Sequence, residues 1–171
     1  MFTLTIVPKT GNQVTIAPRN ENELAALCRQ GRWAQFVREF ALIVLYMGQT
    51  PQERAAGRSI ERNGIGLNKH KAPFGSYYAE YIGLKLSEGG RLGKCLDLDK
   101  HIGGRAANVR QETDRIIADH LGQVLKIWES MDSFKGFSQA LQNLLPEMSA
   151  RSKKQNKLSL TQAEKLLIGM K

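Results

Sequence analysis

Apolar residues alternate with polar ones at the start of the chain, where Leu4 and Ile6 flank a threonine. After "PKTGN" a second run places Val14 and Ile16 on one face. This period of two on both sides of a glycine-containing turn predicts a β-hairpin over 2–17. A two-stranded ribbon is marginally stable alone, so we expect it to pack on the helices that follow.

Beyond the hairpin the apolar spacing changes to that of amphipathic helices. The widest apolar stripe covers 32–47, and a second long stripe covers 106–131. Between them, "TPQE" at 50–53 combines a threonine cap, a proline in the first turn and a glutamate three residues after the cap, which predicts a helix from Pro51 to about Arg62. The sequence therefore predicts a mainly α fold (α+β), in which the N-terminal hairpin packs on a bundle of five or six helices.

The chain length of 171 residues is enough for one hydrophobic core. We predict a single globular domain over 1–146, because Pro146 ends the last long apolar pattern. The polar and cationic residues that follow predict a basic linker at 147–158, and "SLTQAEKLLIGM" predicts a short C-terminal helix within 159–171.

The chain is strongly basic, with 25 Lys and Arg against 16 Asp and Glu and a formal net charge of +9. Such an excess attracts phosphate backbones, anionic membranes or acidic proteins. The longest apolar run, "FALIVLYM" at 40–47, is far shorter than the roughly 20 residues of a membrane span. No secretory leader is visible, and Cys28 and Cys95 do not form a disulfide framework, so we expect a cytoplasmic protein with no membrane role.

One stretch, "ERNGIGLNKHKAPFGSYYAEYI" at 61–82, brings glycines, positive charges and aromatic rings together. The backbone at Gly64 and Gly66 can approach a ligand closely, and a helix that starts near Ala72 directs its positive end at an anion. The cations of this stretch predict a phosphate cradle. Its rings suit the stacking of bases from a single strand, although their helical spacing also fits a place in the core.

The same region, "GRSIERNGIGLNKHKAPFGSYYAEYI" from Gly57 to Ile82, resembles a short segment found in phage and plasmid proteins of unassigned function. The pattern there runs from a basic residue through "NG-x-G" to an "FGS"-like helix start, usually with an aromatic residue where this chain has Leu67. The resemblance implies a mobile-element origin, with DNA metabolism or defence evasion as the setting, and it implies no catalytic residue. The matching residues are Arg58, Asn63, Gly64, Gly66, Phe74, Gly75 and Ser76.

Two further stretches are similar to ligand motifs. "EGGRLGKC" approaches a phosphate-binding P-loop, but Glu88 replaces the first glycine and Cys95 replaces the Ser or Thr after the lysine. "DLDKH" offers Asp97, Asp99 and His101 as weak candidate ligands for magnesium or manganese. The simpler interpretation is that one of these carboxylates caps a helix while the histidine is exposed. No nucleophile elbow or Cys–His spacing is visible, so we expect neither catalysis nor a cofactor.

The basic charge and the 61–82 stretch predict a non-enzymatic accessory protein that binds DNA or RNA through its phosphates, with single strands slightly favoured, and the resemblance implies that it belongs to a phage or plasmid. An alternative is a protein-interaction module, either an inhibitor of a host defence complex or a helical subunit of a ribonucleoprotein complex. A metal-dependent nuclease is a third hypothesis. The predicted nucleic-acid contacts are Arg58, Arg62, Lys69, His70, Lys71 and Tyr77 in the central segment, and Arg151, Lys153, Lys154 and Lys157 in the cationic tail.

Overall fold

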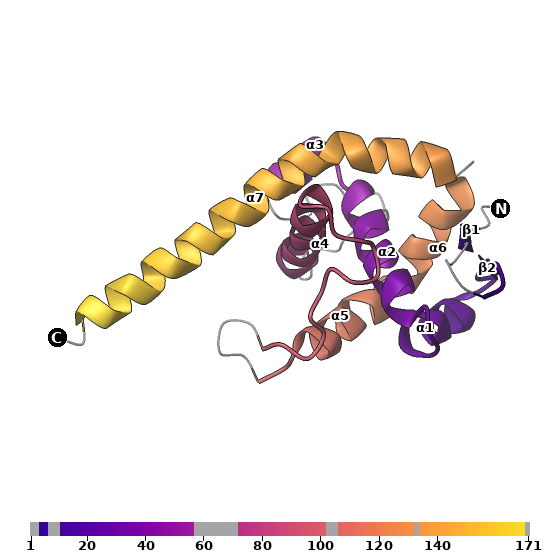
Figure 1. Ribbon diagram of the computed structural model, residues 1–171, viewed down its shortest axis with the longest axis horizontal. Helices are drawn as coiled ribbons and strands as arrows, with labels where there is room; N and C mark the ends of the chain where they lie inside the picture. The colour runs from indigo at the N-terminus through magenta and orange to yellow at the C-terminus, as the bar shows by residue number, and fades with distance from the viewer. Residues whose placement is uncertain (1–3, 7–10, 57–71, 102–105, 132–133, 170–171) are drawn as a thin grey trace.

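The computed structural model describes residues 4–6, 11–56, 72–101, 106–131 and 134–169, with the side chains of the last helix described from 136 to 154. In this part of the chain it contains one two-stranded sheet and seven helices, which confirms the predicted mainly α fold with an N-terminal hairpin (Figure 1). The elements are β1 Leu4–Ile6, β2 Val14–Ile16, α1 Glu21–Arg29, α2 Ala34–Met47, α3 Pro51–Ala56, α4 Ala72–Ser87, α5 Val109–Ala118, α6 Leu121–Ser130 and α7 Phe134–Gly169.

The hairpin packs on the helical core through Leu4 and Ile16, with Val14 partly buried against the same core. β1 and β2 are antiparallel, and Leu4 lies opposite Ile16 in the register. Both side chains are buried and belong to the same hydrophobic cluster as the helices. The hairpin thus packs on the helices, as a marginally stable two-stranded ribbon requires.

Helix α2 is the centre of the fold. Its residues from Val37 to Tyr46 are all buried, and α1, α4, α5 and α6 pack around it. The ring of Phe40 lies 4.7 Å from that of Trp128 in α6 and 4.6 Å from that of Phe137 in α7, measured between ring centroids. Aromatic contacts of this kind add about 0.5–1.5 kcal/mol each beyond the burial of their area. The stripe predicted at 32–47 is therefore the central helix.

The structure differs from the single long helix predicted over 106–131, because α5 and α6 are separate helices. The break falls at Asp119 and His120, where the backbone of His120 leaves the helical region with φ −129° and ψ 18°. The His120 ring is fully buried, and its Nδ1 lies 2.5 Å from the carbonyl oxygen of Ile116. The apolar pattern continues in phase through this buried histidine to Val124, so periodicity alone does not reveal the break.

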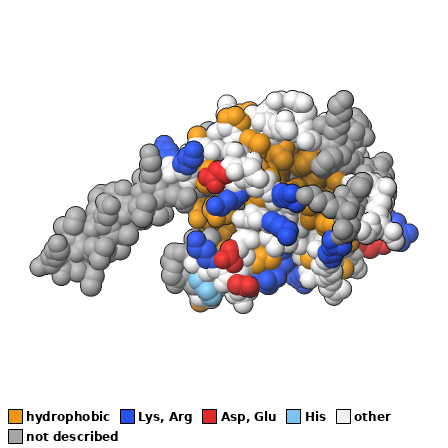
Figure 2. All heavy atoms as spheres, in the orientation of Figure 1, with side chains coloured by type: hydrophobic (Ala, Val, Ile, Leu, Met, Phe, Trp, Pro, Cys, Tyr) orange, Lys and Arg blue, Asp and Glu red, His pale blue; other side chains and the backbone are white. Residues whose placement is uncertain are grey.

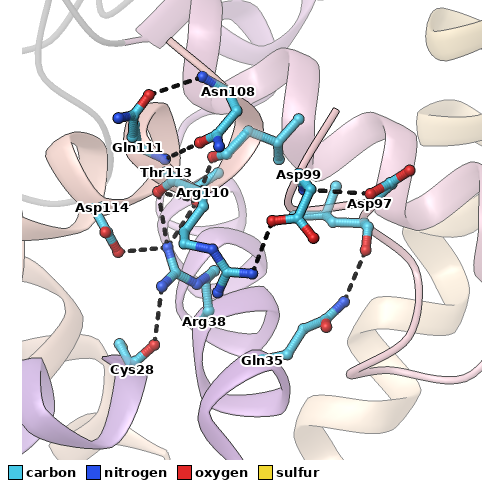
Figure 3. A network of polar contacts seen from close by, with 12 residues as sticks. Cys28, Gln35, Arg38, Asp97, Asp99, Asn108, Arg110, Gln111, Thr113 and Asp114 are labelled. Carbon is cyan, nitrogen blue, oxygen red and sulfur yellow. Dashed lines mark hydrogen bonds and ion pairs between the residues drawn. The ribbon is translucent and has the colours of Figure 1, made fainter. Parts of the chain in front are cut away.

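A buried polar network joins three of the helices (Figure 3). Arg38 lies in the middle of α2 and is only 2% exposed. Its Nη1 lies 2.5 Å from Oδ1 of Asp114 in α5 and donates a 2.9 Å hydrogen bond to Oγ1 of Thr113. Its Nη2 donates to the carbonyl oxygen of Cys28 in α1 at 3.2 Å. Removal of one partner from such a buried ion pair typically costs about 3–5 kcal/mol, so this network fixes the positions of α1 and α5 on α2.

Helix α3 begins with the capping box that the sequence predicts. The backbone N–H of Glu53 donates to Oγ1 of Thr50 at 3.2 Å, and the backbone N–H of Thr50 donates to Oε1 of Glu53 at 3.1 Å. The structure describes this helix as far as Ala56. The predicted end of the helix, near Arg62, lies outside the described residues.

Helix α7 differs from the predicted linker at 147–158, because the chain is helical without interruption from Phe134 to Gly169. Pro146 lies inside this helix, where it removes one backbone hydrogen bond. Met148, two residues later, is fully buried, so packing against the rest of the fold holds the helix together across the proline. Figure 1 shows α7 passing over α4 and its C-terminal part leaving the body of the molecule. How the chain divides into domains stays a prediction.

The described helices include none that is both long enough and apolar enough to cross a membrane.

Candidate nucleic-acid interface

The segment predicted to cradle phosphates, 58–71, lies outside the described residues. The role of its residues stays a prediction. The structure does describe the helix that follows it, α4, which begins at Ala72 as the sequence predicts. The predicted contacts that fall in this segment are Arg58, Arg62, Lys69, His70 and Lys71.

The aromatic rings of α4 occupy different environments. Tyr78 is 2% exposed, and its hydroxyl donates a hydrogen bond to the Glu112 carboxylate in α5, so this ring belongs to the core. Tyr77 is half-buried and meets Tyr78 edge-on, with ring centroids 5.4 Å apart. Tyr81 is also half-buried, and the ammonium group of Lys85 lies 5.3 Å from its ring centroid. The expected core role is therefore confirmed for Tyr78, while base stacking by Tyr77 stays a prediction.

Helices α4 and α7 pack against each other in opposite directions. Glu80 lies beside Arg151, and one turn later Gly83 lies against Met148. A Cβ atom at Gly83 would come within 2.5 Å of the Met148 Cβ, so this close approach depends on the missing side chain. Because the pair is antiparallel, the start of α4, which follows the predicted cradle in sequence, points toward the C-terminal part of α7.

Arg151 lies in a polar cluster between helices. Its Nη1 donates to the Tyr46 hydroxyl at 3.1 Å and lies 3.8 Å from the Glu80 carboxylate, and its Nη2 lies 2.5 Å from Glu147. The Tyr46 hydroxyl in turn donates to Oε2 of Glu80 at 2.9 Å. Burial of the phenol, reinforced by the Glu80 carboxylate, raises the pKa of Tyr46, so the hydroxyl remains a donor at neutral pH. Arg151 therefore links α7 to α2 and α4.

The remaining predicted cations of the tail are in α7. Lys153 and Lys154 are exposed and make no ion pair with a described residue. The Lys157 side chain lies outside the described residues. Lys153 lines the edge of an open groove between α4 and α7 that also includes Ser87 and Pro146. Two of the tail residues are therefore accessible to an anionic partner.

The candidate metal ligands stand at a turn between α4 and α5. Oδ1 of Asp97 accepts the backbone N–H of Asp99 at 3.2 Å, and Oδ1 of Asp99 lies 3.2 Å from Nη2 of Arg110 (Figure 3). The expected helix cap is therefore corrected: Asp97 closes a turn, and the cap of α5 is Asn108. Among the described residues, no three His, Cys, Asp or Glu side chains are close enough together to hold a metal ion.

The loop that is similar to a P-loop does surround an anion, but this anion is the chain's own Glu39. Glu39 is fully buried in α2. Its carboxylate accepts backbone N–H groups from Gly93 at 2.7 Å, Cys95 at 3.2 Å and Leu96 at 3.1 Å, and the side-chain amide of Gln35 at 2.9 Å. These N–H groups are therefore satisfied within the protein, and they do not serve a nucleotide phosphate.

The same loop carries a turn from Arg91 to Lys94, which we call the cationic turn. The Lys94 N–H donates to the Arg91 carbonyl oxygen at 3.0 Å, and Gly93 has φ +97°, a conformation that favours glycine. A Cβ at Gly93 would lie 3.2 Å from the Cβ of Phe36, so the turn sits directly on α2. Arg91 and Lys94 are both exposed, and neither forms an ion pair with a described residue.

Acidic and basic side chains are distributed unequally between the interior and the surface. Three described carboxylates are buried, those of Glu39, Glu53 and Glu80, against one buried cation, Arg38. On the outside, eleven described Lys and Arg residues are exposed against six Asp and Glu residues. Figure 2 shows several of these Lys and Arg side chains spread over the face in view. Over the described residues, the fold therefore makes the surface more basic than an even distribution of the charges would.

No protein-family model, curated protein or solved structure matches this chain.

The role of Glu39 and the cationic turn are absent from the sequence-based prediction, although the sequence does contain a signal for both. Arg38 and Glu39 interrupt the otherwise apolar stripe of α2, and a charged pair in such a stripe must find buried partners. The glycines around Arg91 mark a loop whose backbone can surround an anion. Neither pattern alone reveals that Glu39 and the glycine-rich loop are partners, because Glu39 and Gly93 are 54 positions apart in the chain.

Proposed function

We propose that this protein binds nucleic acid through the phosphate backbone, without catalysing a reaction. The observation that carries the proposal is the excess of exposed cations over exposed carboxylates, together with the burial of three carboxylates inside the fold. Lys and Arg at a surface attract phosphates and release their counterions, a driving force that requires no catalytic group. Lys153 and Lys154 belong to this proposal, as do the cations predicted at 58–71.

The test is binding of the purified full chain to labelled oligonucleotides over a range of salt concentrations. We expect retardation of single strands and duplexes at low salt, and a steep loss of affinity as salt rises. Replacement of Lys153 and Lys154 by glutamate should weaken binding without a change in the unfolding temperature, because both side chains are exposed. Absence of binding by the unmodified protein at low salt would refute the proposed function.

A second candidate function is that of a protein-interaction module. The observation that favours it is the continuation of α7 to Gly169, beyond the part of the helix that packs on α4 (Figure 1). An extended helix of this kind can dock in the groove of a partner. Affinity purification from the native cell, with and without nuclease treatment, separates the two functions. A partner protein that persists after nuclease treatment would favour the interaction module, whereas copurified nucleic acid would favour the first proposal.

A further inference from the structure

We infer that the cationic turn at 91–94 is a binding site for two neighbouring phosphates of a nucleic-acid strand. This inference rests on the proposed function and identifies a second contact surface for it, outside the predicted segments at 58–71 and in the tail. Arg91 and Lys94 at its two ends are exposed and form no ion pair with a described residue, and the turn is fixed to the central helix of the fold.

The turn brings the Cα atoms of its two cationic residues close together. The hydrogen bond from the Lys94 N–H to the Arg91 carbonyl oxygen brings the first and fourth residues of the turn together. In such a turn the two Cα atoms are less than about 7 Å apart, a separation comparable to that of adjacent phosphates on one strand. The guanidinium of Arg91 can donate two parallel hydrogen bonds to one phosphate, while the ammonium of Lys94 contacts the next.

The rigidity of the turn comes from the buried carboxylate beneath it. Glu39 accepts N–H groups from Gly93, Cys95 and Leu96, and hydrogen bonds to a charged acceptor are stronger than those between neutral groups. The backbone of the turn is therefore ordered before any ligand arrives. A preorganised site loses less conformational entropy on binding than a flexible lysine-rich tail does.

No described carboxylate forms an ion pair with Arg91 or Lys94. Two exposed carboxylates lie three residues from the turn, Glu88 before Arg91 and Asp97 after Lys94. Glu88 pairs with Lys85, with Nζ and Oε2 3.9 Å apart, and Oδ1 of Asp97 accepts the backbone N–H of Asp99. Asp99, on the other side along the chain, is paired with Arg110. Arg91 and Lys94 thus remain available to an external anion.

The experiment compares two double variants of the full chain that lose the same net charge. The first is Arg91→Gln with Lys94→Gln. The second, the control, is Arg115→Gln with Lys126→Gln, which removes two exposed cations from α5 and α6. The readout is the slope of log affinity against log salt concentration for a labelled single strand and for a duplex.

Loss of two phosphate contacts should reduce the magnitude of that slope by about 1.4 for the single strand and about 1.8 for the duplex. The control should change the slope far less, because its cations contribute only to the general field of the protein. Equal changes in both double variants would overturn the inference while leaving the proposed function standing. Absence of binding by the unmodified chain would refute the proposed function itself.

A third variant, Gly93→Ala, keeps both charges and disturbs the turn, because alanine is strained at φ +97° and its Cβ would press on Phe36. We expect it to weaken nucleic-acid binding at salt concentrations where the variant is still folded by circular dichroism. Unchanged affinity in the folded variant would contradict a role for the turn geometry.

A titration with polyglutamate, an anionic polymer without phosphates, tests the class of partner. If Arg91→Gln with Lys94→Gln weakens binding of polyglutamate as much as it weakens binding of the oligonucleotide, the turn is a general anion surface and the phosphate assignment is overturned.

Discussion

At the scale of single residues, the buried Glu39 carboxylate is the most informative side chain of the fold. It lies inside an apolar helix, yet it is surrounded by donors from the loop after α4 and from Gln35. A buried carboxylate is tolerated only when such donors compensate for its lost hydration. Glu39 is therefore the buried acceptor that holds the backbone of the glycine-rich loop.

We expect Glu39→Gln to lower the free energy of unfolding by about 2–4 kcal/mol, because the amide nitrogen of glutamine would face backbone N–H groups that need an acceptor. Chemical denaturation monitored by circular dichroism measures the change. Glu129→Gln, an exposed site on α6, is the control and should stay within about 0.5 kcal/mol of the unmodified protein. A similarly small effect at Glu39 would mean that the loop does not depend on this carboxylate.

The two cysteines give a second prediction at this scale. Both are free, and burial raises the pKa of the Cys28 and Cys95 thiols from the ordinary 9.0 to about 12. At neutral pH we expect a thiol-specific reagent to label neither residue in the native protein and both residues after denaturation. The unfolded thiols lose their protons near pH 9 while the native ones retain them, so the free energy of unfolding should fall as the pH rises from about 9 to about 12.

At neutral pH, rapid labelling of the native protein would show that the thiols are accessible and would contradict this prediction. The single variants Cys28→Ala and Cys95→Ala identify which thiol reacts.

At the scale of helices and strands, the absence of a side chain at Gly83 allows α4 and α7 to approach each other closely. The space at Gly83 is filled by Met148 of the other helix. We expect Gly83→Ala to lower the free energy of unfolding by about 1–3 kcal/mol, because the added methyl forces the helices apart. Gly122→Ala is the matched control: its Cβ would meet only the movable carboxylate of Glu21, so helix propensity should make it neutral or stabilising.

A double-mutant cycle tests the mechanism of this effect. Met148→Gly removes the Cβ, Sδ and Cε atoms that the methyl group would meet, so the double variant should be less destabilised than the sum of the two single variants. Strict additivity in thermal or chemical denaturation would show that the two positions do not compete for the same space.

The elements differ in how well the sequence predicts them. The hairpin and α2 follow from period and width of the apolar pattern, and the start of α3 follows from a capping signal. The break between α5 and α6 is not predicted by periodicity, because the buried His120 occupies the position where the helical spacing of apolar residues requires a buried side chain. The continuity of α7 is not predicted either, because a proline usually ends a helix, and here contacts with α4 and other helices hold the helix together.

The candidate site is harder to predict than the fold. Tyr78 shows why: its spacing places it on a helix, but only the position of α5 decides that its hydroxyl contacts Glu112. Arg151 looks like a free cation of a tail, and its contacts with Tyr46 and Glu80 come from helices far away in the chain. Exposure of charge depends on tertiary contacts that a linear pattern does not contain.

At the scale of the whole molecule, the first part of α7 packs against the other helices, and its C-terminal part extends away from them (Figure 1). The contacts of α7 with the core that the structure describes, at Phe137, Met148, Arg151 and Ser152, all precede Lys154. A chain that ends after Lys154 should therefore keep its unfolding temperature within a few degrees of the full chain, as measured by circular dichroism.

The same shortened chain should bind oligonucleotides with a smaller salt dependence, because it lacks three lysines, Lys157, Lys165 and Lys171. A large loss of thermal stability would show that the C-terminal part of α7 supports the fold. An unchanged salt dependence would remove the extended part from the proposed interface.

The hydrogen bond between Glu39 and Gly93 also constrains the order of events during folding. It joins residues 54 positions apart, so a long stretch of chain must close before it can form, and closure of that stretch costs entropy. Before this closure the loop is not held on α2, so Arg91 and Lys94 lack the fixed arrangement of the cationic turn. The proposed recognition of neighbouring phosphates requires the loop to lie on the central helix, so we expect the folded protein and the unfolded chain to differ in the anions that they bind.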